Sequence, residues 1–202
     1  MKNKEPQLLT DQDVYLFNEG NHVRLYQKFG AHPVTMGGVE GTHFAVWAPN
    51  ANTVYVMGDF NFWNKTANPL KQRGQSGIWE GFVPGVKEGQ NYKYNIISRY
   101  QDFRAEKADP LAFASEVPPK TASIVCDPEH AWGDEDWMKS RAAKNSLKNP
   151  VSIYEVHLGG WRKGKTYLEL ADELVEYVKW QGYTHVEFMP ITEHPFEPSW
   201  GY

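Results

Sequence analysis

Residues 42–57 read Thr-His-Phe-Ala-Val-Trp-Ala-Pro-Asn-Ala-Asn-Thr-Val-Tyr-Val-Met, and this stretch decides the class of fold. Apolar side chains recur at every second position of 42–48 and again of 53–57, and the turn residues Pro49 and Asn50 follow the first run. A period of two places successive side chains on opposite faces of an extended chain. The stretch therefore predicts two β-strands, each with one face that can be buried, joined by a short turn.

Further short runs of the same kind follow this stretch. They are bounded by clusters of Gly, Pro, Asn and Asp, and they cover residues 78–83, 91–97 and 122–126. Short strands separated by turn signals are typical of an antiparallel, immunoglobulin-like β-sandwich. We therefore expect a β-sandwich over residues 22–126, with irregular structure at residues 22–38.

The residues before the sandwich are expected to form a tail over residues 1–21 that contains one short helix. Thr10 or Asp11 can cap the start of this helix, because their side-chain oxygens accept hydrogen bonds from free backbone N–H groups. Gly20 can end it.

The pattern changes from alternating to helical in the last quarter of the chain. Residues 151–157 and 185–189 are strand-like runs. Thr166 and Glu169 have the T-x-x-E spacing of a capping box, which predicts the start of a helix between these runs. Gly182 is expected to end the helix in a left-handed conformation.

Strand, helix and strand over residues 150–202 predict a βαβ unit with parallel strands. Parallel sheets are normally covered on both faces, whereas one such unit covers only one face. A (β/α)8 barrel needs about 250 residues, far more than follow the charged connector at residues 127–149. We therefore expect the incomplete start of a (β/α)8 barrel, in the front part of a larger protein, with Leu174, Val175 and Val178 exposed or poorly buried.

Charge and composition exclude several classes of function. The chain has 202 residues, 41% of them hydrophobic, and a net charge of −4, which is typical of a globular protein without a basic nucleic-acid surface. No run approaches the roughly 20 apolar residues of a membrane span, and no secretory signal follows Met1. The single cysteine, Cys126, excludes an internal disulfide framework. We expect a cytoplasmic protein with neither nucleic-acid nor membrane partners.

The sequence also lacks motifs for metals and nucleotides. Its 7 histidines show no close metal-ligand spacing, and no glycine-rich phosphate loop is present. We therefore expect no metal site and no cofactor. Aromatic residues make up 14% of the chain, which fits either large aromatic cores or stacking on sugar rings.

Several segments resemble the glycogen branching enzymes, a family of the α-amylase clan. The resemblance covers residues 11–202 and rests on Tyr26-Gln-Lys-Phe-Gly-Ala-His-Pro33, Gly41-Thr-His-Phe-Ala-Val-Trp-Ala-Pro-Asn-Ala51, Gly58-Asp-Phe-Asn-Phe-Trp63, Ile153-Tyr-Glu-Val-His-Leu-Gly159, Thr184-His-Val-Glu-Phe-Met-Pro190 and Glu193-His-Pro-Phe-Glu-Pro-Ser-Trp-Gly-Tyr202. The last of these, together with residues 154–159, is the most specific. One departure is Gly160, where the family commonly has Ser.

The resemblance implies both a fold and a reaction. The fold is a carbohydrate-binding module of the sandwich type followed by the first βαβ unit of a catalytic (β/α)8 barrel. Such enzymes cut α-1,4-glucan chains and transfer the cut piece to a 6-hydroxyl, which forms the α-1,6 branches of glycogen. A retaining reaction of this kind needs two carboxylates about 5–5.5 Å apart, and the family carries them on later barrel strands. We therefore assign no catalytic residue here, not even Glu155, Glu187 or Glu193, and expect the isolated chain to be inactive.

The resemblance also implies contacts with α-1,4-glucans such as glycogen, amylose and maltooligosaccharides. In related proteins the residue matching Trp63 stacks on glucose, the residue matching Lys93 donates to a sugar hydroxyl, and the residue matching Tyr202 supplies the ring beneath the sugar at the cleavage site. Packing of Trp63 against the barrel or the connector is the alternative. Trp47 and Trp79 are expected in the core or between domains.

Two other interpretations remain open. The chain could be a stand-alone α-glucan-binding module without catalysis, although such a module would not need residues 154–202. It could also be a different member of the clan, such as a debranching enzyme or a trehalose-releasing hydrolase. The loop at residues 193–202 disfavours this last interpretation.

Overall fold

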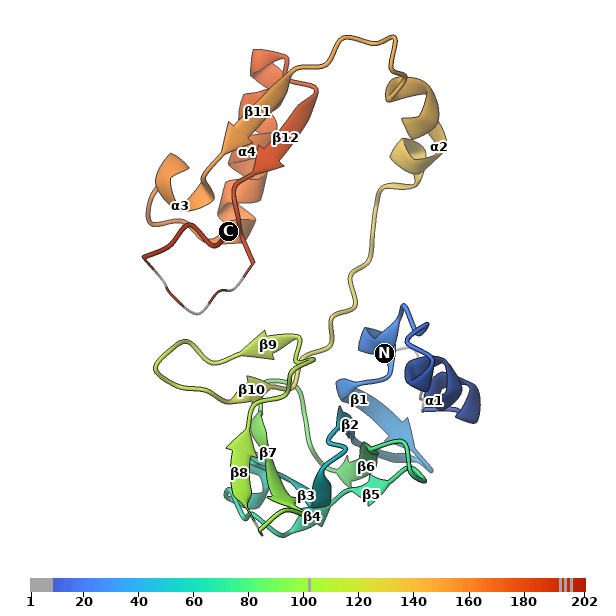
Figure 1. The fold of residues 1–202 in the computed structure, drawn as a ribbon. Helices are drawn as coiled ribbons and strands as arrows, with labels where there is room; N and C mark the ends of the chain where they lie inside the picture. The colour runs from blue at the N-terminus through green and yellow to red at the C-terminus, as the bar shows by residue number, and fades with distance from the viewer. Residues whose placement is uncertain (1–8, 102, 193, 195, 197) are drawn as a thin grey trace. The chain divides into compact units, whose positions relative to one another are not determined.

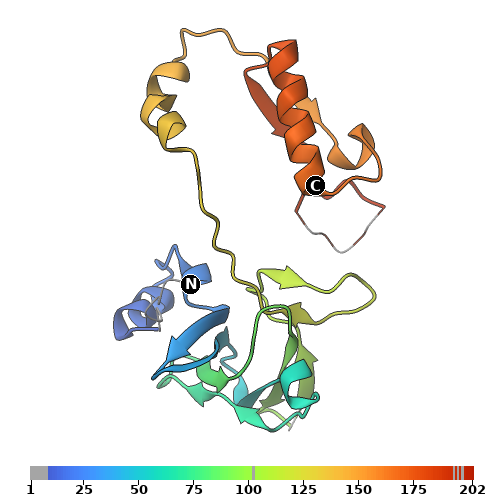
Figure 2. The ribbon, with the colours of Figure 1, turned by 180° about the vertical axis from the view of Figure 1, so that it is seen from behind.

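The structure is a computed structural model that describes residues 9–101, 103–192, 194, 196 and 198–202. The chain divides into two compact units, one up to His130 and the other from Ala131 onward, and each is described by itself (Figures 1 and 2). Within the described residues, no helix has both the length and the apolar character needed to cross a membrane.

The first unit is a β-sandwich preceded by a short helix (Figure 1). Its elements in chain order are α1 (Asp11–Asn18), η1 (Leu25–Gln27), β1 (Gly30–Met36), β2 (Val39–Trp47), β3 (Ala51–Gly58), η2 (Asp59–Asn61), β4 (Asn68–Pro69), β5 (Lys71–Gln72), β6 (Ile78–Pro84), β7 (Asn91–Ser98), β8 (Arg104–Lys107), β9 (Ala114–Ser115) and β10 (Ser123–Ile124). One sheet has the order β1-β2-β6-β5; the other has β4-β3-β7-β10-β9, with β8 also paired to β7. The strands predicted from alternation at 42–48, 53–57, 78–83 and 91–97 are confirmed as β2, β3, β6 and β7.

The irregular structure expected at residues 22–38 is wrong for residues 30–36, which form β1. This strand pairs antiparallel with β2, from Gly30 opposite Ala45 to Met36 opposite Val39. Gly37 and Gly38 connect the two strands with positive φ angles of 57° and 81°, as a two-residue hairpin turn requires. A proline is tolerated within β1 because the strand lies at the edge of its sheet.

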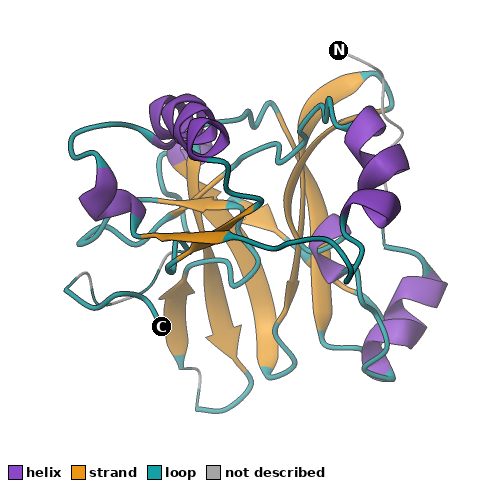
Figure 3. Ribbon diagram, turned by 90° about the horizontal axis from the view of Figure 1, so that it is seen from above, coloured by secondary structure: helices purple, strands orange, loops and turns teal. Residues whose placement is uncertain are grey.

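The hydrophobic core lies between the two sheets, whose strands are among those drawn in orange in Figure 3. Phe44 of β2 and Val54 and Val56 of β3 are completely buried there. Trp79 of β6 is also buried, and its indole N–H donates to the carbonyl oxygen of Ala48 at 3.0 Å. The core position expected for Trp79 is therefore confirmed.

Trp47 lies on the outer side of the sandwich, so of the two places expected for it the core is wrong, and packing between domains stays a prediction. It neighbours the core residue Val46 along β2, and successive side chains of a strand point to opposite faces. Its side chain is 53% exposed. Its ring meets the edge of Phe17 of α1 at a centroid distance of 5.9 Å, and its indole N–H donates to the carbonyl oxygen of Ser76 at 3.3 Å.

Helix α1 begins with a reciprocal cap formed by Thr10 and Asp13. The Asp13 backbone N–H donates to Thr10 Oγ1 at 3.1 Å, and the Thr10 backbone N–H donates to Asp13 Oδ2 at 2.8 Å. Asp13 also contacts His22 at 2.9 Å and Lys28 at 3.2 Å. Burial would raise the pKa of Asp13, but the hydroxyl and backbone N–H of Thr10, together with His22 and Lys28, contact its carboxylate and hold the pKa well below its usual range. The helix expected within residues 1–21 is confirmed, with Thr10 as its cap.

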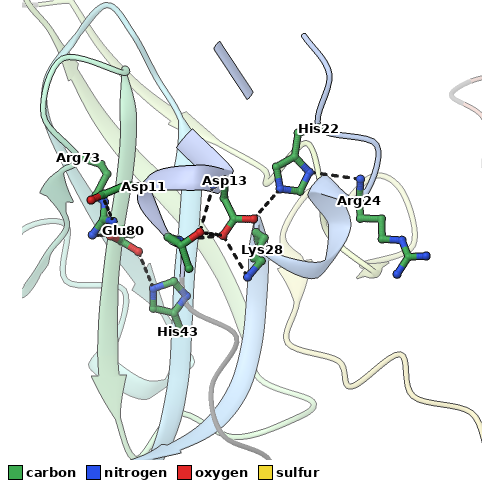
Figure 4. A network of polar contacts seen from close by, with 9 residues as sticks. Asp11, Asp13, His22, Arg24, Lys28, His43, Arg73 and Glu80 are labelled. Atoms are coloured by element: carbon green, nitrogen blue, oxygen red, sulfur yellow. Dashed lines mark hydrogen bonds and ion pairs between the residues drawn. The ribbon is translucent and has the colours of Figure 1, made fainter. Parts of the chain in front are cut away.

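A second chain of polar contacts joins α1 to the outer face of the sheet that contains β2 and β6 (Figure 4). Arg73 contacts Asp11 at 2.9 Å and Glu80 at 3.2 Å. Glu80 in turn contacts His43 of β2 at 3.1 Å. Apolar contacts of Leu9 and other residues of the helix region add to this attachment. Helix α1 is thus packed onto the sandwich rather than lying apart from it.

The buried carboxylate of Asp109, in the loop after β8, is bonded to two tyrosines of β7. The hydroxyls of Tyr92 and Tyr94 donate to Asp109 Oδ2 at 2.8 and 2.9 Å. The Leu111 backbone N–H donates to Asp109 Oδ1 at 2.9 Å, and Ser123 Oγ accepts from the Asp109 backbone N–H at 2.8 Å. Burial raises the pKa of Asp109, and the hydrogen bonds offset only part of that effect.

The second unit contains the expected strand, helix and parallel strand. Its elements are α2 (Glu135–Lys144), β11 (Ile153–Val156), α3 (Leu158–Trp161), α4 (Tyr167–Gln181) and β12 (His185–Phe188). Strands β11 and β12 pair in parallel, from Ile153 opposite His185 to Val156 opposite Phe188. The capping box of Thr166 and Glu169 is confirmed, and so is the left-handed end at Gly182, whose φ is 80°. Helices α2 and α3 were not expected.

Helix α4 buries a regular apolar face against the small sheet. Leu174 and Val178 are buried beside Val156 of β11, whereas Val175 is half-exposed. The poor burial expected for Leu174 and Val178 is therefore wrong, because one face of the two strands is enough to cover them. Membership of this unit in a (β/α)8 barrel stays a prediction.

Candidate functional site

A tightly hydrogen-bonded turn follows β3 and carries Trp63. It begins at Gly58, contains η2, and is held by the side chain of Asn61. Asn61 Oδ1 accepts from the Gly58 backbone N–H at 3.0 Å, and its Nδ2 donates to Val56 O at 3.1 Å and to Asn68 Oδ1 at 2.7 Å. Asn61 Nδ2 also donates to the carbonyl oxygen of Asn64 at 3.4 Å, so the turn is held on both sides of Trp63.

Two consecutive residues of this turn have positive φ angles, in the left-handed region that favours glycine. Phe62 has φ 53° and ψ 37°, and Trp63 has φ 58°. For residues other than glycine this conformation costs roughly 1–2 kcal/mol each, because the Cβ atom approaches the carbonyl oxygen. Strained backbone of this kind persists where its surroundings over-determine it, and it clusters at functional sites. Phe60, in contrast, turns inward and packs on the core beside Phe44.

The carboxylate of Asp59 fixes the orientation of the Trp63 indole. Trp63 Nε1–H donates to Asp59 Oδ1 at 3.1 Å. The other oxygen, Asp59 Oδ2, accepts from the backbone N–H of Asn91 at 2.8 Å, at the start of β7. The indole remains 36% exposed. The arrangement is a pre-oriented aromatic surface at the edge of the sheet where β3 ends and β7 begins.

Lys93 lies on the outer face of β7, near the same end of the sheet. Its neighbours Tyr92 and Tyr94 point into the core, so Lys93 points outward. Its Nζ donates to Thr121 Oγ1 at 2.7 Å. Asn95, the next residue on this face, donates to the carbonyl oxygen of Lys65 at 2.8 Å, so the end of the Trp63 turn lies against the same face.

The structure thus brings Trp63 and Lys93 to one end of one sheet within the first unit. This end offers an aromatic surface, an ammonium donor and a hydroxyl, with the donor held in place by its partner. Such a set suits a neutral ligand with apolar faces and many hydroxyls. Sequence reasoning missed Asp59 and Thr121 as the partners of these two side chains.

Tyr202 belongs to the second unit and so forms no part of the set within the first. It is 87% exposed. Its neighbour Trp200 lies 6.3 Å from the ring of His157, centroid to centroid. His157 follows β11 directly, so this contact ties the end of the chain to the carboxyl end of that strand. Carboxyl ends of parallel strands are where barrel active sites form.

Two of the three carboxylates considered from sequence lie within the described residues. Glu155 and Glu187 lie opposite each other on β11 and β12, and both are exposed. Glu193 lies outside the described residues. Across the described part of the chain, no group of three or more His, Cys, Asp and Glu side chains is arranged to hold a metal ion.

Comparison with known proteins relates the chain to carbohydrate-active enzymes. Residues 28–112 match the family model of carbohydrate-binding module 48, the isoamylase N-terminal domain. The chain is 54% identical over 194 residues to 1,4-alpha-glucan branching enzyme GlgB 2 of Streptomyces coelicolor, covering 96% of this chain and 26% of that enzyme. It is 52% identical over 198 residues to GlgB of Albidiferax ferrireducens, covering 96% and 31%.

The matched part is the N-terminal part of these relatives. The chain spans about a quarter to a third of their length, with 28% for GlgB of a Synechococcus species at 48% identity. Among solved structures, the chain is similar to Klebsiella pneumoniae pullulanase complexed with maltotriose, with a TM-score of 0.56 and 25% identity. That match covers 82% of this chain and 18% of the pullulanase chain.

Proposed function

We propose that these 202 residues are the glucan-binding N-terminal region of a 1,4-alpha-glucan branching enzyme. The reason is that almost the whole chain is similar to the N-terminal part of these enzymes. The similarity extends well beyond the carbohydrate-binding module at residues 28–112 and includes the βαβ unit. A stand-alone binding module is therefore disfavoured. A cytoplasmic location remains a prediction from sequence.

The proposed reaction is transfer of an α-1,4-glucan segment to a 6-hydroxyl, which creates an α-1,6 branch. Retention of configuration requires a carboxylate nucleophile and an acid–base carboxylate about 5–5.5 Å apart. We assign neither group to a residue of this chain. The role proposed for these residues is to bind the glucan and to begin the catalytic barrel. Purified chain incubated with amylose should produce no branched product in an iodine-staining assay.

The main support for glucan binding is the hydrogen bond by which Asp59 holds the Trp63 indole, called here the Trp63 clamp. An indole held by Asp59 and left partly exposed presents a flat apolar face at little further entropic cost. Lys93, held by Thr121, supplies a donor near the same end of the sheet. We propose that the Trp63 indole stacks on a glucose ring and that Lys93 donates to a hydroxyl of the same chain.

Tyr202 is proposed as a second, separate glucan contact in the complete enzyme. It lies in the segment that follows β12, where the carboxyl ends of parallel strands shape a barrel active site. A ring beneath the reacting sugar can favour a flattened transition state over the ground state. This role requires the remaining barrel, whereas the role of Trp63 does not.

Affinity electrophoresis in glycogen-containing gels tests the binding function. The wild-type chain should be retarded, and Trp63→Ala should be retarded less, while its circular dichroism spectrum stays unchanged. Stacking of a nucleic-acid base, a comparable contact, contributes about 1–3 kcal/mol, which corresponds to a loss of roughly 5- to 150-fold in affinity. Tyr100→Ala, an exposed aromatic at the other end of β7, is the matched control. Retardation that survives Trp63→Ala unchanged would place the sugar site elsewhere.

A further inference from the structure

The side chain of Phe62 is the most exposed large apolar group beside the Trp63 clamp. It is 95% exposed, although phenylalanine is usually buried. Within the described residues, no hydrogen bond or ring contact involves this side chain. An exposed phenylalanine therefore stands next to the proposed sugar contact without a local partner.

The other side chains of the turn each have a structural role that Phe62 lacks. Asp59 and Asn61 hold the backbone through hydrogen bonds. Phe60 packs against the core, and Trp63 is clamped by Asp59. Folding of the turn would be served better by glycine at position 62, because glycine adopts positive φ without steric conflict. The strained phenylalanine is thus unexplained by the turn itself.

The same conformation gives the Phe62 side chain a defined place beside Trp63. Both residues have positive φ angles in a turn whose backbone is held by hydrogen bonds, so their side chains leave a fixed backbone at adjacent positions. An α-1,4-glucan is a repeating ligand that presents one sugar ring after another along a curved chain. A ligand seated on Trp63 therefore offers a further ring to a neighbouring aromatic side chain.

We propose that Phe62 is a second aromatic contact of the glucan site and packs against a glucose unit adjacent to the one on Trp63. This inference rests on the glucan-binding function proposed above. It assigns the site a specificity for chains of at least two consecutive glucose units. It also gives the backbone strain at position 62 a function, since the strain places an aromatic ring where sugar passes.

Isothermal titration of the 202-residue chain with maltoheptaose tests the proposal through Phe62→Gly and Phe62→Ala. A ring contact as strong as an aromatic pair corresponds to a loss of about 2- to 12-fold in affinity, and we expect a loss of this size for both variants. Phe62→Gly should also unfold at the wild-type temperature or higher, because it relieves the left-handed strain. Phe103→Ala removes another exposed phenylalanine, beyond the far end of β7, and should bind as the wild type does.

The outcomes separate this inference from the proposed function. Wild-type affinity in Phe62→Gly, with weakened binding in Trp63→Ala, would overturn the role of Phe62 and leave the Trp63 site intact. Equal losses in Phe62→Gly and Phe103→Ala would overturn it as well, because the effect would then not be local. Absence of maltoheptaose binding by the wild-type chain would overturn both proposals.

Discussion

Replacing Asp59 by alanine tests whether the orientation of Trp63, rather than its mere presence, produces glucan binding. The substitution removes the acceptor of the Trp63 indole N–H at 3.1 Å and of the Asn91 backbone N–H at 2.8 Å. The indole then loses its fixed orientation, and the turn loses its bond to β7. We expect weaker binding of maltoheptaose although Trp63 and Lys93, the proposed sugar contacts, are both still present.

The magnitude follows from the two hydrogen bonds. Each contributes about 0.5–1.5 kcal/mol net, so Asp59→Ala should lower the free energy of unfolding by about 1–3 kcal/mol. At about 4 °C per kcal/mol, the unfolding temperature should fall by roughly 4–12 °C. Asp59→Asn keeps one acceptor oxygen, can preserve one of the two bonds, and should fall between wild type and Asp59→Ala in both properties.

Titration calorimetry and thermal unfolding monitored by circular dichroism measure these two effects in the same samples. The rank order wild type, Asp59→Asn, Asp59→Ala should appear in affinity and in unfolding temperature. Titrations are to be run well below the unfolding temperature of each variant. Full affinity in Asp59→Ala, in a folded protein, would refute the reasoning that the carboxylate prepares Trp63 for its ligand.

Two further substitutions test the packing and the charges of the first unit. Trp79→Ala should destabilise the sandwich by about 3–5 kcal/mol, since it leaves a large core cavity and frees the Ala48 carbonyl oxygen; a urea titration that shows less than about 1 kcal/mol would contradict the core assignment. Asp13 has a depressed folded pKa, so its contribution to stability is present above the ordinary value of about 3.9 and is lost as the pH falls below it. Urea titrations at pH 6 and pH 3 should therefore show a smaller loss of stability for Asp13→Asn than for the wild type, and equal losses would exclude the proposed role of Asp13.

Alternation along the chain was sufficient to predict the long central strands but not the edge of the first sheet. Strands β2, β3, β6 and β7 carry regular apolar faces, and their positions follow from that pattern. Strand β1 contains glycine, histidine and proline and is set by pairing with β2. Its clearest local signal is the Gly37-Gly38 pair at the turn.

The two ends of helix α4 could be predicted from sequence because they depend on local signals. The capping box at Thr166 and the glycine end at Gly182 depend on hydrogen bonds between near neighbours. The burial of Leu174 and Val178 depends instead on contact with one face of a two-stranded sheet. The sequence pattern does not show that two strands are enough to cover these side chains.

The sequence alone indicates Trp63 and Lys93 as candidate sugar contacts, but it does not indicate the residues that hold them. Trp63 and Lys93 stand in short motifs, so a resemblance can assign them. Asp59 lies only four residues from Trp63, but the contacts that complete the site join distant parts of the chain: Asp59 accepts from Asn91, and Lys93 donates to Thr121. The left-handed conformation of Phe62 is imposed by the surrounding hydrogen bonds, and a phenylalanine carries no local signal for it.

A crystal structure of the chain with maltoheptaose tests the central claim most directly. We predict a glucose ring packed on the exposed face of the Trp63 indole, with Lys93 Nζ within hydrogen-bond distance of a hydroxyl of the same oligosaccharide. Oligosaccharide bound elsewhere on the chain, with Trp63 and Lys93 free of sugar, would contradict it.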